Sequence, residues 1–196
     1  MTKTKQKNSE AIKKYDINTE NNVNIQGNVK LSIKYGNKTL KSTIIKNSAT
    51  KDLFYGLALI LRQDPDSSAI STYLPKYLSV GDGTDGSETT FTKNTLTHEL
   101  LKNGRRQTVY NYGSIEVDAT TKTVSTTFQG IITYNLVQNN PIKELGLYGT
   151  NDGNNTLTNR IVLNGTEESD PDYPITLNPG QSLVVDWVIV FKISNN

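Results

Sequence analysis

The chain has 196 residues, enough for one domain of ordinary size, and 34% of them are hydrophobic. The 25 threonines and 22 asparagines favour β-strands joined by many turns. Cysteine is absent and histidine occurs once, which excludes a disulfide framework, a thiolate metal site, a thiol nucleophile and a multi-histidine metal site. The net charge of +2 is unevenly placed, because residues 1–62 hold 12 basic and 4 acidic side chains and residues 63–196 hold 9 and 15.

The first 20 residues are predicted to form a flexible basic arm, followed by a single domain over residues 21–196. The arm is too poor in apolar side chains to offset the entropy of ordering; it has only Ala11, Ile12, Tyr15 and Ile17 beyond the first residue. Lys13 and Lys14 are candidate contacts to an acidic partner, and a solvated lysine-rich tail is the alternative. Nucleic acid is an unfavoured partner, since the basic residues are almost all lysine and lack interleaved aromatics.

A β-hairpin is predicted next. Apolar side chains alternate along residues 23–35, which is typical of a strand with one buried face. Gly36 and Asn37 form the turn, and residues 39–45 return as the second strand.

Residues 49–62 are predicted to form one α-helix, because apolar side chains recur there at helical spacing. Thr50 or Ser48 is expected to cap its start, and the Asp64–Pro65 pair ends it. Apolar residues occupy most of its circumference, so we expect the helix to be buried or packed against a neighbouring subunit. The candidate interface residues on it are Phe54, Leu57, Ile60 and Leu61.

Seven further strands are predicted, over residues 77–80, 105–112, 114–117, 124–136, 142–148, 157–163 and 182–193. The last of these is apolar on both faces, which predicts a central strand covered on both sides, with Trp187 in the core. The chain is therefore expected to be mainly β: an antiparallel β-sandwich or jelly-roll-like fold with one buried helix at 49–62 and an extended N-terminal arm. No apolar run is long enough for a membrane span, so we expect no membrane partner.

Motifs for catalysis or cofactor binding are not found in the sequence, and we expect no cofactor and no enzymatic activity. Asp82, Asp85 and Glu88 are weak candidates for a cation site, but their spacing does not match a calcium loop, and turns rich in Asp and Gly explain them equally. His98 and Glu99 are adjacent, so their side chains are expected to diverge rather than act on one substrate atom.

The ten tyrosines leave a carbohydrate-binding alternative open, because sugar faces stack on exposed aromatic rings. Tyr110 and Tyr112 are two residues apart and would share one face of a strand. Cross-strand aromatic packing is the more frequent use of tyrosine in sheets.

Three segments, taken in order, resemble a pattern in structural proteins of tailed bacteriophages. They are residues 77–84 with 95–100, residues 142–149 with 157–161, and residues 175–191. The shared motifs are a GxGT loop, an E-[IL]-G-L strand, an L-x-x-R strand and a final L-x-V-x-W-x-I-x-F strand. The lysine-, asparagine- and isoleucine-rich composition is similar to that of short-tailed phages, including the crAss-like group.

The resemblance implies a β-sandwich virion protein, made in the cytoplasm of the host bacterium. It would form a homo-oligomeric ring, collar or fibre adaptor in the neck or tail and would contact copies of itself and other virion proteins. A basic patch meeting an acidic patch on the next copy could close such a ring. A head fibre, a capsid decoration or a glycan-binding module is the alternative.

Asp186 is a polar residue inside an apolar strand and needs a partner. Arg160 is the expected partner of either Asp186 or Glu144, and we predict that one of these carboxylates lies within hydrogen-bonding distance of its guanidinium.

Overall fold

The protein is described here by a computed structural model, which places residues 21–62, 67–83, 92–102, 104–111, 113–153 and 156–195. The predicted N-terminal arm, residues 1–20, lies outside these residues. The described chain is mainly β, as predicted, and its elements in order are β1 (Asn21–Tyr35), β2 (Lys38–Ala49), α1 (Lys51–Leu61), α2 (Ser67–Thr72), β3 (Tyr77–Gly81), β4 (Gln107–Thr108), β5 (Tyr110–Asn111), β6 (Glu116–Asp118), β7 (Thr123–Thr133), α3 (Tyr134–Val137), β8 (Glu144–Tyr148), β9 (Leu157–Val162) and β10 (Gln181–Asn195).

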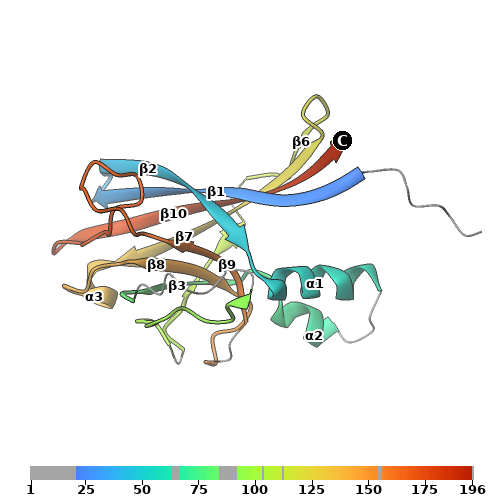
Figure 1. Ribbon diagram of the computed structural model, residues 1–196. Helices are drawn as coiled ribbons and strands as arrows, with labels where there is room; N and C mark the ends of the chain where they lie inside the picture. Colours follow the sequence, from blue (N-terminus) through green and yellow to red (C-terminus); the bar gives the residue numbers. More distant parts are fainter. Residues whose placement is uncertain are drawn as a thin grey trace, which may run out of the picture.

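The ten strands form one antiparallel sheet that curls into a nearly closed barrel (Figure 1). Nine of them follow the order β4-β3-β8-β9-β2-β1-β10-β7-β5, and β6 pairs with the other half of β7. The two ends of this order are consecutive in the chain: β4 pairs with β3, and β5, one residue later, pairs with β7. Residues 107–111 thus bridge the two edges of the sheet.

The sheet has two halves that face each other across the core, as a sandwich would require, but the halves are continuous. Strand β2 pairs with β1 from Lys38 to Asn47 and then with β9 at Ser48 and Ala49. The core fills the space between the halves, with buried side chains from β1, β7 and β10 on one side and from β3, β8 and β9 on the other. The finding is therefore one curled sheet rather than two separate ones.

Strand β10 has the central position predicted for it. It pairs with β1 along its whole length, from Asn21 opposite Asn195 to Tyr35 opposite Gln181, and with β7 on its other side. Its inward face is buried, and Trp187 is fully buried there. Its outward face is only partly covered, because Val188 and Val190 are half-buried.

Helix α1 confirms the predicted position but not the predicted burial. Leu53, Gly56 and Leu59 are buried, because this side of the helix packs against β9 and α2. Four large side chains are exposed instead: Phe54, Tyr55, Ile60 and Leu61. The helix lies at one end of the barrel, not over a face of the sheet, so most of its circumference stays accessible (Figure 1).

The start of α1 is also held differently from the prediction. The hydroxyl of Thr50 does not cap the helix; it donates a hydrogen bond to the backbone carbonyl of Leu157 on β9. The Thr50 N–H donates to the carbonyl of Thr158, 2.9 Å away. The first turn of the helix is therefore fixed to the barrel wall. Helices α2 and α3, of 6 and 4 residues, were not predicted from the sequence.

Candidate functional site

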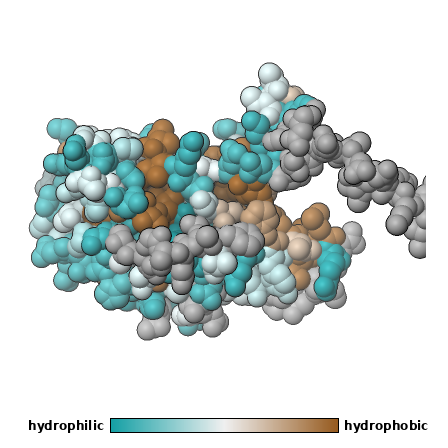
Figure 2. Space-filling view, viewed as in Figure 1, coloured by the Kyte–Doolittle hydropathy of each residue, from teal (hydrophilic) through white to brown (hydrophobic). Residues whose placement is uncertain are grey.

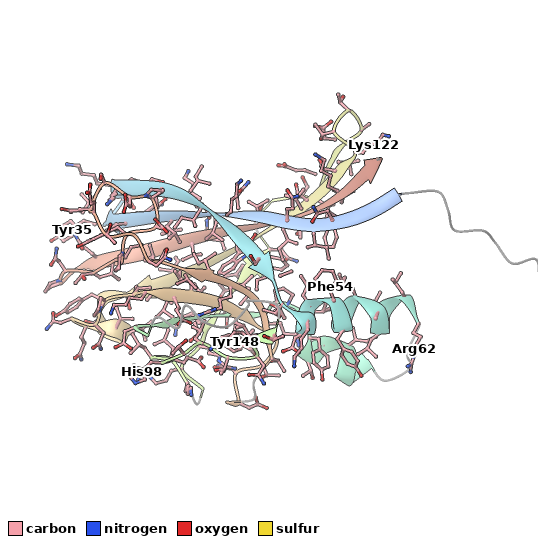
Figure 3. The ribbon with its side chains drawn as sticks, viewed as in Figure 1. Tyr35, Phe54, Arg62, His98, Lys122 and Tyr148 are labelled. Atoms are coloured by element: carbon pink, nitrogen blue, oxygen red, sulfur yellow. The ribbon has the colours of Figure 1, made fainter. Side chains whose placement is uncertain are left out.

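A stripe of apolar side chains runs along the accessible side of α1. It consists of Phe54, Leu57, Ala58 and Leu61, whose spacing of three, four and seven residues places them on one helix face. Leu61 is 84% exposed and Phe54 is 41% exposed. We call these four residues the helix stripe. Figure 3 places Phe54 on the side of α1 that faces the extended end of β1.

The opposite side of α1 is anchored by aromatic packing. The rings of Tyr55 and Tyr73 meet edge to face with centroids 4.8 Å apart. A Cβ at Gly56 would lie 2.8 Å from the Cβ of Tyr73, so glycine is what allows the helix to approach this closely. Packing against Tyr73 thus fixes the helix, so the helix stripe has a defined position.

A second apolar surface lies on the strands at the edge of the core, where Ile25 and Phe191 are half-buried and pack against it. The strand registers place four side chains in one row across the sheet: Ile25 on β1, Phe191 on β10, Val124 on β7 and Val117 on β6. We call this row the strand platform. Because side chains alternate along a strand, the platform continues the core-facing side of β1 and β10. Yet Val117 is 73% exposed.

The helix stripe and the strand platform belong to the same end of the barrel. Asn47 on β2 pairs with Gly27 on β1, two residues from the platform residue Ile25, and α1 begins four residues after Asn47. Figure 1 shows α1 and the extended ends of β1 and β10 at this end of the molecule. Figure 2 shows apolar surface there. We call the stripe and platform together the apolar mouth.

The platform also borders a surface hollow. Val117, Val124 and Phe191 line it, together with Lys122 at the rim, and its volume is about 410 Å³. Exposed apolar surface that is contiguous, concave and edged by polar groups marks an interaction site more often than scattered exposed residues do. The platform has these three properties, and together with the helix stripe at the same end it is our candidate functional site.

The turn that joins β6 to β7 is polar and fixed at the rim of this site. The Asp118 carboxylate accepts hydrogen bonds from the N–H groups of Thr120 and Thr121, at 2.8 and 3.2 Å. Hydrogen bonds from the side chain and backbone of Thr121, and from the backbone of Thr120, lower the pKa of Asp118. Lys122 completes the turn with a φ of 53° and marks its tip in Figure 3. The β6–β7 hairpin, which contributes Val117 and Val124 to the platform, therefore has a defined turn.

An acidic and a basic segment of the chain touch through backbone carbonyls. The acidic segment 167–172 lies beside the basic β1–β2 hairpin, where the Lys41 ammonium donates to the Glu168 carbonyl at 3.0 Å. The Thr43 hydroxyl donates to the Pro171 carbonyl at 3.1 Å. Lys13 and Lys14, the other basic candidates, lie outside the described residues. The apolar mouth, rather than charge, is the more distinctive surface.

The predicted pairing of Arg160 is confirmed, and its partner is Glu144. The Arg160 Nε atom donates to Glu144 Oε2 at 3.2 Å, and Nη2 lies 3.2 Å from Oε1. The Thr97 N–H donates to the same carboxylate at 3.1 Å. Both side chains are buried, so this pair holds the segment around Thr97 onto the sheet and is not part of a surface.

Asp186 does not bind Arg160. Its carboxylate accepts a hydrogen bond of 2.7 Å from the side-chain amide of Gln129, the residue opposite it on β7. Trp187 is fully buried among the core residues, as the sequence predicted. These two residues support the β7–β10 pairing from opposite faces of the same strand.

One buried polar cluster was missed by the sequence analysis. Arg106 forms a two-pronged ion pair with Glu99, at 2.7 Å from Nε and 3.0 Å from Nη2. Its guanidinium carbon lies 3.6 Å from the centroid of the Tyr148 ring, and Nη1 donates to the Thr150 carbonyl at 2.8 Å. Glu99 and Arg106 are seven residues apart in an irregular segment, so no periodic pattern could have revealed the pair.

Tyr148 connects this cluster to the covering segment. Its hydroxyl accepts a hydrogen bond of 2.8 Å from the Leu96 N–H. Burial raises the pKa of Tyr148, with a smaller contribution from the nearby Glu99 carboxylate. The tyrosine therefore remains a neutral hydrogen-bonding group beneath residues 92–106.

The adjacent residues His98 and Glu99 diverge, as predicted. The His98 side chain is exposed, and its Nδ1 forms a hydrogen bond with the Asp82 carboxylate. The Glu99 side chain is fully buried. Asp85 and Glu88 of the weak cation candidate lie outside the described residues. Among the residues that the structure describes, no three or more potential metal-ligating side chains gather, and no helix is long and apolar enough to cross a membrane.

Comparison of the chain with protein-family models, curated protein sequences and solved structures finds no match.

Proposed function

We propose that this chain is a structural subunit of a tailed-bacteriophage virion and acts through protein–protein contacts, not catalysis. In this proposal it assembles as a homo-oligomer in the neck or tail, as a ring, collar or fibre adaptor. It contacts copies of itself and other virion proteins and is made in the cytoplasm of the host bacterium. Two lines of reasoning support this: the sequence motifs that resemble phage structural proteins, and the apolar mouth.

The apolar mouth is the observation that carries the proposal. A monomer that functions alone gains nothing from exposing a leucine and two valines at the end of its core, because exposed contiguous apolar surface favours association. The mouth joins a fixed helix to a continuous strand row, so a partner would meet a rigid surface. Rigid apolar surfaces bind with little loss of conformational freedom.

The mass of the full-length protein in solution tests this proposal, measured by light scattering or analytical ultracentrifugation. We expect an oligomer that persists as salt is raised, because apolar contacts are not screened by ions. Leu61→Glu should shift it toward the monomer, and Ile44→Glu, a matched change at an exposed residue on β2, should not. A monomer at high concentration, or an oligomer indifferent to Leu61→Glu, would contradict it.

The virion location has its own test. Particles of the phage that encodes the chain should contain it in fixed stoichiometry when they are purified and analysed by mass spectrometry. Labelling with an antibody should then place it at the neck or tail. Its absence from washed particles would reject the virion assignment while leaving self-assembly intact.

Glycan binding is the second candidate function, and one observation favours it. Tyr110 is 70% exposed, and it shares a surface hollow of about 220 Å³ with the amide side chains of Gln107 and Gln129. An exposed ring beside amide groups is a combination that can stack on a sugar and bond its hydroxyls. The other tyrosine predicted for this face, Tyr112, lies outside the described residues.

A glycan array distinguishes this candidate from the first. Binding of a defined sugar that is lost in Tyr110→Ala and kept in Tyr35→Ala, a change at another exposed tyrosine, would support a receptor-binding or capsid-decorating role. Sugar binding that is unaffected by Tyr110→Ala would remove the site.

A further inference from the structure

We propose that the apolar mouth of each copy receives the apolar part of the N-terminal arm, residues 11–17, from a neighbouring copy. This inference rests on the proposed homo-oligomer and names what covers its exposed surface. The occupant is the short segment Ala11–Ile17, and the site is formed by the helix stripe and the strand platform.

The position of the first described strand carries the argument. β1 begins at Asn21, and in the strand register Asn21 is four residues from the platform residue Ile25. The described fold therefore begins at the end that carries the mouth, and 20 residues precede that point. Tyr15 is six positions before Asn21, and an extended chain of that length reaches about 20 Å. The apolar part of the arm is thus tethered close to the end of the molecule that carries a mouth.

The composition of the arm fits the mouth. Ala11, Ile12, Tyr15 and Ile17 fall within seven residues and are flanked on both sides by polar sequence. These four side chains are too few to bury themselves, whereas the mouth offers two apolar surfaces, the helix stripe and the strand platform. An aromatic and two β-branched side chains are well suited to the row of β-branched and aromatic residues on the platform.

The direction of β1 favours a neighbouring copy over the same chain. β1 stays paired with β10 up to Asn21, four residues before the platform residue Ile25. Docking into its own mouth would need a sharp reversal between Ile17 and Ile25. An arm that continues outward instead meets the next subunit.

Disulfide trapping tests the inference directly, because the chain has no cysteine of its own. Two full-length single-cysteine proteins, Tyr15→Cys and Val117→Cys, are mixed under mild oxidation. We expect a cross-linked heterodimer. The matched control replaces Val117→Cys by Ile44→Cys, which is similarly exposed on β2 and should cross-link at least tenfold less.

Each result has a separate meaning. Cross-linking to Val117→Cys and not to Ile44→Cys supports the inference. Equal cross-linking to both, or none, overturns it. A chain carrying both Tyr15→Cys and Val117→Cys that closes within itself at high dilution shows docking in the same copy and also overturns it. Circular dichroism confirms that the variants are folded.

A second variant separates this inference from the proposed function. Ile12→Glu with Tyr15→Glu should reduce the solution mass of the oligomer, and Thr4→Glu with Gln6→Glu, an equal charge change elsewhere in the arm, should not. If the protein is an oligomer that neither pair of changes alters, the arm inference fails and the proposed homo-oligomer stands. If the unmodified protein is a monomer, both fail.

Discussion

Two regions of the molecule, the buried polar cluster around Arg106 and the apolar mouth, treat polar and apolar side chains in opposite ways. Beneath residues 92–106, the fold buries two arginine–glutamate pairs and a tyrosine hydroxyl, all with partners. At the mouth, it leaves valine, leucine and phenylalanine side chains exposed. The number of apolar residues in the chain therefore does not by itself limit the size of the core. Some of them are placed where a neighbour, not the fold, would cover them.

The largest loss of stability is expected where a buried ion pair is broken. Arg106→Ala leaves the Glu99 carboxylate buried without its partner, and breaking such a pair costs about 3–5 kcal/mol of the free energy of unfolding. Lys102→Ala, a nearby change at an exposed residue, should have little effect. Urea denaturation measures both. A loss below about 1 kcal/mol in Arg106→Ala would show that the pair is not desolvated.

Apolar truncations should separate the core from the mouth. Leu183, fully buried on β10, should lose about 2–5 kcal/mol on replacement by alanine, because a cavity remains. Val117→Ala should change the free energy of unfolding of the isolated subunit by about 0.5 kcal/mol or less. Denaturation at low protein concentration, where subunits are separate, measures the two. Equal losses would mean that the platform is part of the subunit core.

The buried polar cluster should also respond to alkaline pH through Tyr148. Its pKa is raised by burial in the folded chain, whereas the unfolded phenol ionises near its ordinary value of 10.0. Folding therefore favours the protonated form, and the contribution of this group is constant below pH 10 and is lost as the pH rises above it. The difference in absorbance at 295 nm between the protein and Tyr148→Phe should show this phenol ionising only with alkaline unfolding. Ionisation in the folded protein at its ordinary pKa would contradict the burial.

The smallest expected effect is at the rim of the mouth. Lys122 has a φ of 53°, which a side chain rarely adopts, so Lys122→Gly should raise the free energy of unfolding by about 0.5–1 kcal/mol. Thr120→Gly, in the same turn but without a positive φ, should lower it instead. Thermal unfolding of both variants gives the answer. If Lys122→Gly is destabilising, the hairpin is not held in the turn described here.

Alternation and helical spacing were sufficient to predict most of the elements. The β1–β2 hairpin, α1, the central position of β10 and the burial of Trp187 all follow from local patterns, because each is determined by which face of an element is apolar. The pair between Glu144 and Arg160 was found because a buried charge requires a partner. The curl of the sheet into one continuous structure could not be predicted, since it depends on β2 changing its partner from β1 to β9.

Of the two parts of the candidate site, only the one on α1 could be predicted from the sequence. Phe54, Leu57, Ile60 and Leu61 were predicted as interface residues because the helix is apolar over most of its circumference. The platform was not, because Ile25, Val117, Val124 and Phe191 come from four distant segments that only the strand register brings into one row. Their even alternation predicted burial, and no local signal marks where a core-facing strand extends beyond its core.

The pairing of β1 with β10 has a consequence for synthesis. These strands join residues near opposite ends of the described chain, Asn21 with Asn195, and β10 also fills the place between β1 and β7. Until β10 leaves the ribosome, β1 and β7 lack their central partner, and pairings over so long a stretch form slowly. The platform row needs β10 as well. An incomplete chain therefore lacks the surface proposed to bind other copies, so premature association of nascent chains through it is prevented by the order of folding.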